Sequence, residues 1–305
     1  MADQRSVSSR ISAPTDHNAP RAQLLPKRGQ FGEAVVHLVI AGLVILWLIP
    51  TLGLLVSSFR TEAAVAATGW WTALVPPFQF TLDNYVAVIT TNNVGQSFVN
   101  SLFVAVPATV MPLLIAAFAA YAFSWMSFPG RDLLFFVVVG LLVIPLQSTL
   151  IPVLRLFTTL GLNGTFPGIW LAHTGYGLPF AIFLLRNFFS SLPREMMEAA
   201  AIDGASPLDT FFRLILPTSV PALAALAIFQ FLWVWNDLLV ALIYLGGEPT
   251  VAPLTVTVSN LVSSLGQGWE LLTAAAFVSM LLPLAVFFGL QRYFVAGILA
   301  GSVKG

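Results

Sequence analysis

The chain has 305 residues, of which 58% are hydrophobic and only 9% are charged, with 13 basic and 13 acidic residues. Soluble domains carry about a quarter charged residues, so a chain this poor in charge cannot cover itself with a surface that water solvates. Lipid is the solvent that suits this composition. The chain also has no cysteine, which excludes disulfides and thiolate metal sites.

The usual motifs of catalytic and nucleotide-binding sites are missing from the sequence. The three histidines are far apart and form no H-E-x-x-H pattern, neither lysine follows a glycine, and no G-x-S-x-G occurs. A metalloprotease helix, a P-loop and a hydrolase nucleophile elbow are therefore excluded. We predict that the chain is not an enzyme and that it binds no metal, nucleotide or nucleic acid.

The first 33 residues, 1–33, are rich in Ser, Pro, Gln and scattered arginines, and this composition predicts a disordered arm. The rest of the chain, 34–305, contains six apolar segments that are each long enough to cross a bilayer as a helix. Helices satisfy the backbone polar groups inside lipid, so we predict an all-α membrane protein. The six predicted spans cover about 34–59, 98–124, 133–154, 168–189, 220–245 and 271–294.

The distribution of positive charge predicts the orientation of these spans. With six spans, both termini lie on one side together with the 2–3 and 4–5 loops, and that side holds all of the 13 basic residues except Arg60 and Arg155. Because cytoplasmic loops carry the excess of Lys and Arg, both termini and the arm are predicted to be cytoplasmic.

The long loop between the first two spans contains Trp70 and Trp71. Tryptophans are enriched at both membrane–water interfaces, so the pair fits an interfacial belt. A surface that meets an external partner fits equally well.

Four polar residues inside the predicted spans are candidates for a translocation path. Gln147 lies beside Pro145 in the third span, and the fifth span contains Gln230, Asn236 and Asp237. An ionisable group at membrane depth is costly and often functional, but such residues also clamp neighbouring helices by hydrogen bonds. Both roles stay open for them, and Pro145 is expected to kink its helix.

A charged segment, EMMEAAAIDGASPLDTFFRLILP at 195–217, interrupts the apolar sequence between the fourth and fifth spans. Gly204 is suited to ending a first helix, while Ser206 and Asp209 around a proline resemble the capped start of a second one. Pro217 is expected to end that second helix. Because helices of about ten residues are marginal in water, the hairpin needs a surface to pack on, either the ends of its own spans or a partner protein.

This segment resembles the EAA loop of ABC-importer permeases. That loop reads E-A-A, three residues, Gly, nine residues, Ile, one residue, Leu-Pro, and the one departure is Leu214 in place of Ile. The matching residues are Glu198, Ala199, Ala200, Gly204, Leu216 and Pro217.

The likeness extends beyond the hairpin. The stretches FVNSLFVA at 98–105, LGLNGT at 160–165 and FLWVWNDLLVAL at 231–242 are similar to the carbohydrate-importer branch. The closing tail, QRYFVAGILAGSVKG at 291–305, looks like the second, MalG-like permease subunit of maltose-type systems.

The resemblance implies a subunit of a binding-protein-dependent importer for a sugar or related polyol, in the bacterial cytoplasmic (inner) membrane. The chain would pair with a second, related permease and form half of the path. ATP and Mg would be held by a separate cytoplasmic ATPase dimer, and an external solute-binding protein would deliver the solute. Glu198 would make a polar contact with the ATPase, while Ala199, Ala200 and Gly204 permit close helix approach. By position, residues 248–267 resemble the loop that contacts the binding protein.

Two other classes of membrane protein fit less well. A secondary transporter usually carries several ionisable residues deep in the membrane to couple ions, and here Asp237 is nearly alone. A structural membrane subunit without ATPase coupling fits the composition, but it leaves the charged hairpin unexplained.

Overall fold

The computed structural model describes residues 30–261 and 267–302, with side chains for 32–261 and 267–291. The described residues are helical and contain no strand, as predicted. The predicted arm lies outside the described residues up to position 29, and the first helix, α1 (Gln30–Ser58), begins four residues earlier than the predicted span. The chain divides into two units, Met1–Thr51 and Leu52–Gly305.

The described part of the first unit is one apolar helix. This helix is the part of α1 that ends at Thr51. Its large side chains are exposed, with Trp47 82% and Leu38 75% exposed. A 27-residue apolar helix is long enough to cross a bilayer. Lipid contact explains why these apolar side chains are exposed in the described part of this unit.

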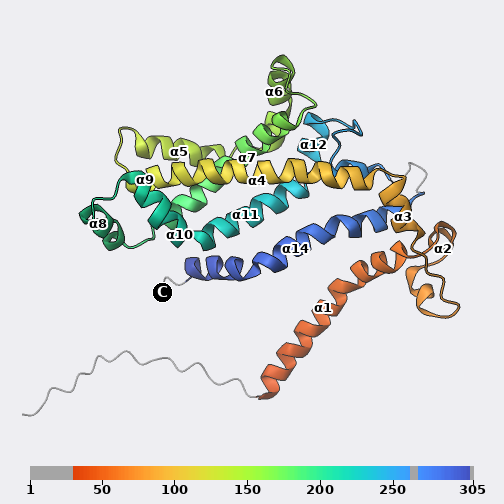
Figure 1. Ribbon diagram of the computed structural model, residues 1–305. Coiled ribbons are helices and arrows are strands. Elements are labelled where there is room, and N and C mark those ends of the chain that lie inside the picture. Colours follow the sequence, from red (N-terminus) through yellow and green to blue (C-terminus); the bar gives the residue numbers. More distant parts are fainter. Residues whose placement is uncertain (1–29, 262–266, 303–305) are drawn as a thin grey trace, which may run out of the picture. The chain divides into compact units, whose positions relative to one another are not determined.

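The second unit is built around four helices that pack on one another. α4 (Val94–Trp125) lies against α7 (Phe166–Phe189), and α11 (Val220–Trp235) lies against both α4 and α14 (Trp269–Ser302) (Figure 1). Alanines line the contacts of α4, and small residues let helix backbones approach closely in a membrane. The buried alanines of α4 are Ala105, Ala108, Ala116, Ala117 and Ala120.

The described helices give four to six membrane spans. Four helices are long and apolar enough to cross a bilayer, and two bent pairs of helices raise the number to six if each pair is one span. The six predicted apolar segments therefore all correspond to helical segments, and the prediction of an all-α membrane protein is confirmed.

The third predicted span, 133–154, is not one straight helix. It consists of α5 (Arg131–Leu141) and α6 (Leu146–Thr159), which are bent by 100°. Pro145 lies at the break; it lacks a backbone N–H and disfavours helical geometry at the residue before it. The expected kink is therefore a complete break.

The fifth predicted span, 220–245, is also interrupted. It comprises α11 and the short helix α12 (Leu239–Tyr244), so residues 236–238 lie in a turn and not within a helix. Hydropathy averaged along the sequence misses this break, because the residues on both sides of it are apolar. The prediction that Asn236 and Asp237 lie in the interior of a helix is wrong.

The loops contribute short helices. After α1 come α2 (Glu62–Ala67), a 3-10 turn (Trp70–Leu74) and α3 (Asp83–Thr90), and after α12 comes α13 (Leu254–Ser259). Trp70 packs closely over Gly53, whereas Trp71 is 62% exposed. Trp71 is thus the more exposed of the two tryptophans.

Candidate functional site: a helical hairpin and a polar seam

The charged segment folds as a helix, a glycine turn and a second helix. The first helix is α8 (Arg194–Ile202), and the second begins with α9 (Pro207–Thr210). Gly204 has φ +74°, a left-handed conformation that glycine adopts without steric cost. The Ser206 hydroxyl accepts a hydrogen bond from the Asp209 N–H at 3.2 Å, which is the predicted N-cap.

The second half of the hairpin is anchored in the membrane domain. The helix continues from α9 through a π-turn at Phe211–Ile215 into α10 (Leu216–Thr218). Phe211 is 1% exposed and its ring stacks on Phe118 of α4, with centroids 4.6 Å apart. The chain then bends by 74° into α11. The predicted site residues Leu216 and Pro217 therefore lie where the hairpin joins the domain.

The first half of the hairpin has only a weaker anchor, the partly buried Met197, which packs against the same apolar core. No residue of α8 is buried, Glu198 and Ala199 are exposed, and Ile202 is 86% exposed. Ala199, Ala200 and Gly204 line an open hollow of about 790 Å³ between the two halves. A nine-residue helix has little stability of its own, so α8 presents an incomplete surface. The predicted coupling residues Glu198, Ala199, Ala200 and Gly204 therefore lie together in the exposed first half of the hairpin and its turn. Leu216 and Pro217 lie apart from them.

The start of the second helix carries a stabilised negative charge. The Ser206 hydroxyl donates to Asp209 Oδ2 at 2.6 Å, and the Arg213 Nε lies 3.4 Å from Asp209 Oδ1. Both contacts favour the carboxylate, the hydrogen bond more than the arginine, and together they hold the pKa of Asp209 below its usual range. The charge lies at a helix N-terminus, where the helix dipole favours it.

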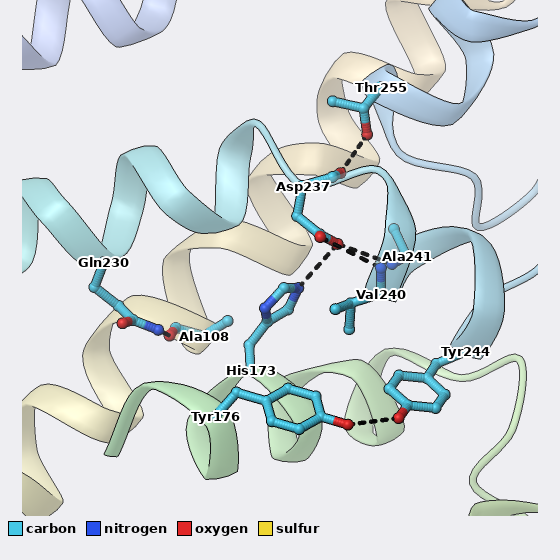
Figure 2. Close-up of polar contacts among 9 residues, drawn as sticks. All are labelled: Ala108, His173, Tyr176, Gln230, Asp237, Val240, Ala241, Tyr244 and Thr255. Carbon is cyan, nitrogen blue, oxygen red and sulfur yellow. Dashed lines mark hydrogen bonds and ion pairs between the residues drawn. The ribbon is translucent and has the colours of Figure 1, made fainter. Parts of the chain in front are cut away.

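A polar seam runs between α7 and α11 at the centre of the second unit (Figure 2). Gln230, 5% exposed, donates from Nε2 to the carbonyl of Ala108 on α4 at 3.1 Å. A Cβ atom on Gly177 of α7 would lie 2.5 Å from the Gln230 Oε1. Glycine at this position therefore allows the buried amide to join three helices near the midpoints of α4 and α7.

Asp237 caps the short helix α12. Its Oδ2 accepts from the Ala241 N–H at 2.9 Å and its Oδ1 from the Val240 N–H at 3.3 Å. The side chain is only 11% exposed, and the Asp237 carbonyl accepts from Thr255 Oγ1 at 2.6 Å. The geometry is that of a clamp between the turn, α12 and α13, one of the two roles that the sequence left open.

The other two path candidates lie outside this network. Asn236 is exposed, and its side-chain amide donates to the Leu232 carbonyl at 2.7 Å, beside its own backbone N–H at 3.1 Å. Gln147 is exposed in the first turn of α6. The structure thus brings Gln230 and Asp237 to the α7–α11 seam but does not bring all four residues together.

His173 is a member of the seam that the sequence analysis did not select. It is 0% exposed, its Nε2 lies 3.7 Å from Asp237 Oδ2, and its ring stands edge-on to Trp233 with centroids 5.2 Å apart. A sequence signal existed: the stretch AHTGYG at 172–177 gathers polar and small residues inside an apolar span. This cluster of polar and small residues lies where α7 meets α11.

Two tyrosines close the seam towards α6. The hydroxyls of Tyr176 and Tyr244 are 2.7 Å apart, and the Tyr244 hydroxyl donates to the Leu150 carbonyl at 3.3 Å (Figure 2). Within 30–261 and 267–302, no three His, Asp or Glu side chains are placed to hold a metal ion. Around these two tyrosines, the seam offers neutral hydrogen-bonding groups and aromatic rings.

Comparison with known proteins identifies the family. The family described as "Binding-protein-dependent transport system inner membrane component" matches residues 97–299. The osmoprotective compounds uptake permease protein GgtD of Synechocystis sp. is 61% identical over 272 residues, 88% of this chain and 91% of that protein. The alpha-glucoside transport system permease protein AglG of Rhizobium meliloti is 57% identical over 256 residues, 82% of this chain and 67% of that protein.

A solved structure shares the fold. It belongs to a bacterial ABC transporter involved in the import of the acidic polysaccharide alginate, and it aligns with a TM-score of 0.72 over 88% of this chain and 100% of that chain. At 24% sequence identity, this likeness supports the arrangement of the helices and not the solute.

Proposed function

This chain belongs to the family of binding-protein-dependent transport system inner membrane components, and we propose that it is a permease subunit of an ATP-driven importer for a neutral sugar or related polyol. Its role is to form half of the translocation path and to transmit conformational change. The chain itself is non-catalytic, and a separate ATPase binds ATP and Mg. The proposed solute class rests on the 61% and 57% identity of this chain to permeases named for osmoprotective compounds and for alpha-glucosides.

The proposed coupling element is α8. Its nine residues include none that is buried, although Ile202 and the neighbouring alanines are apolar. A short helix in that state gains stability by docking on another protein. In the proposed complex Glu198, Ala199, Ala200 and Gly204 contact a cytoplasmic ATPase of an ATPase dimer, while Leu216 and Pro217 transmit the motion to α11.

The proposed assembly contains further partners. A second, related permease completes the path, and an extracytoplasmic binding protein delivers the solute to the face that carries residues 248–267. Both termini lie in the cytoplasm of a bacterial cell, because that orientation places 11 of the 13 basic residues on the inner side.

Reconstitution tests this function. The chain is co-expressed with the second permease and the ATPase, and the complex is placed in vesicles with the binding protein on the outer side. The expected result is ATP-dependent uptake of maltose, trehalose or sucrose that requires the binding protein. Uptake without ATP, driven by an ion gradient, would identify a secondary transporter instead. A complex that imports none of these probes under either condition would overturn the proposed solute class.

A further inference from the structure

We propose that Gln230, Trp233 and Tyr176 form a subsite on this chain for one ring of a neutral sugar or polyol, an inference that rests on the proposed function. Such a subsite would make this subunit a direct determinant of solute selectivity, and not only a passive wall of the path.

Two hollows meet at these residues. One, of about 270 Å³, lies between α7 and α11, and the other, of about 230 Å³, reaches the break between α5 and α6. Tyr176 and Trp233 line both of them, so the two hollows are neighbours. Each is smaller than a typical small-molecule site, but together they fall within the usual range of about 300–1,000 Å³. The first is lined by Tyr176, Gly177, Phe180, Phe229, Gln230 and Trp233.

The lining matches the chemistry of a sugar ring. Aromatic rings offer flat apolar faces with a polar edge, and Trp233 and Phe180 are 37% and 42% exposed. Gln230 uses its Nε2 to bind Ala108, and its Oε1 accepts no hydrogen bond within the described part of the chain. This oxygen is therefore available to a hydroxyl of the solute, at a position fixed by the buried amide. A few fixed polar groups among aromatic ones are typical of small-molecule sites.

Charge also restricts the occupant. No Asp, Glu, Lys or Arg lines either hollow, so an anionic or cationic solute would find no counter-charge there. A lipid chain is the competing apolar occupant. It would leave the Gln230 oxygen without a partner, and this favours the sugar ring.

The position of the hollows suits a path. Gly177 and Ala108 lie near the midpoints of the 24-residue helix α7 and the 32-residue helix α4. Leu142 and Ile144, from the break between α5 and α6, line the second hollow. Non-helical backbone at membrane depth is tolerated where it is buried in protein or lines a water-filled cavity. The break next to the hollow is consistent with a solute path at this depth.

A cysteine reporter tests the subsite, because the chain has no native cysteine. Phe180→Cys places a thiol in the first hollow, and Phe183→Cys on the same helix is the matched control, 36% exposed and outside both linings. The complete complex in vesicles is treated with a small methanethiosulfonate reagent and a non-hydrolysable ATP analogue. Labelling of this chain is followed by mass, with binding protein that is either empty or loaded with maltose, trehalose or sucrose.

The expected result is that loaded binding protein slows labelling of Phe180→Cys about tenfold, as nine-tenths occupancy would, and leaves Phe183→Cys unchanged. If Phe180→Cys does not assemble, Phe229→Cys on α11 reports on the same hollow. Equal labelling of the reporter with empty and loaded binding protein, in a complex whose wild type imports the probe, would overturn the subsite alone. A thiol that is blocked in the complex but reactive in the isolated chain would show that the partner permease covers the hollow, and it too would overturn the subsite.

Transport by a variant gives a second test. Trp233→Ala is expected to lower the maximal rate of uptake about tenfold, while loaded binding protein still stimulates ATP hydrolysis. Trp47→Ala, the same change at an 82% exposed residue of α1, is expected to keep the wild-type rate. Equal rates for both variants would contradict the subsite. A wild-type complex that imports none of the probes would instead overturn the proposed function, and the subsite with it.

Discussion

The helix α8 and the seam around Asp237 are both polar interruptions of an apolar chain, yet they differ in how their groups are satisfied. Every residue of α8 is at least partly exposed, and Ile202 is 86% exposed. At the seam, Gln230 is 5% exposed, and the Asp237 carboxylate accepts two backbone hydrogen bonds. The seam residues Gln230 and Asp237 are held mainly by contacts within this chain, whereas α8 makes few such contacts.

This difference separates stability from assembly. Changes in the seam break contacts that the chain makes with itself, so they lower its own free energy of unfolding. Changes on α8 leave that free energy nearly unaltered and act on whatever docks there. The following substitutions test this separation, beginning with the largest expected effect on unfolding.

Gly177→Leu is expected to be the most damaging. Its Cβ would lie 2.5 Å from Gln230 Oε1 and 2.7 Å from Nε2, so the amide must leave the Ala108 carbonyl. Overpacking a filled interior costs about 1–3 kcal/mol. Gly175→Leu on the same helix is the control, because a Cβ there meets no atom within 4 Å. The midpoints of unfolding in SDS titrations measure both changes, and equal losses would contradict the close packing at Gly177.

Asp237→Ala is expected to cost about 1 kcal/mol, the value of a helix N-cap. It removes the acceptors for the Val240 and Ala241 N–H groups. Asp237→Asn keeps one acceptor oxygen and should retain most of the stability. The same SDS titration distinguishes them. If the asparagine variant unfolds as early as the alanine variant, the charge and not the cap is what the fold requires.

Isoleucine-to-glutamate changes compare the two halves of the hairpin itself. Ile202→Glu is expected to change the free energy of unfolding by less than about 0.5 kcal/mol, because the side chain is 86% exposed. Ile215→Glu, at a residue that is 0% exposed, places a carboxylate in the apolar core and should lower the free energy of unfolding clearly more than Ile202→Glu does. Thermal unfolding of this chain, purified without the ATPase, is the measurement. A large loss for Ile202→Glu would show that α8 packs on its own chain.

Acid should produce the smallest effect. Because the pKa of Asp209 is lowered in the folded chain, the carboxylate stabilises the hairpin above the unfolded pKa of about 3.9. That contribution is lost as the pH falls through the lowered pKa. Asp209→Asn should remove this part of the acid dependence, so it should be slightly less stable than the wild type at pH 7 and approach it at pH 3. Thermal unfolding between pH 3 and pH 7 compares the two chains, and identical acid profiles would contradict the assignment.

Sequence patterns predicted the local features of this protein better than its tertiary ones. Gly204 and Ser206 act through their own backbone neighbours, so their roles in the hairpin could be predicted and are confirmed. The turn at 236–238 depends on side chains that replace helical hydrogen bonds, which hydropathy does not detect. His173 is isolated in sequence and meets Asp237 only because α7 packs beside α11. Contacts of this kind depend on tertiary packing and leave only a weak trace in one sequence.

The most direct test of the account is whether α8 holds an ATPase. The chain is tagged and co-expressed with the second permease and the ATPase, and the proteins that remain bound after mild detergent extraction are quantified. Gly204→Val forces a β-branched residue into a left-handed turn, whereas Gly204→Asn is tolerated there. The account predicts that the valine variant loses the ATPase, keeps the second permease and unfolds like the wild type. An ATPase that stays bound to the valine variant at the wild-type level would contradict α8 as the docking element.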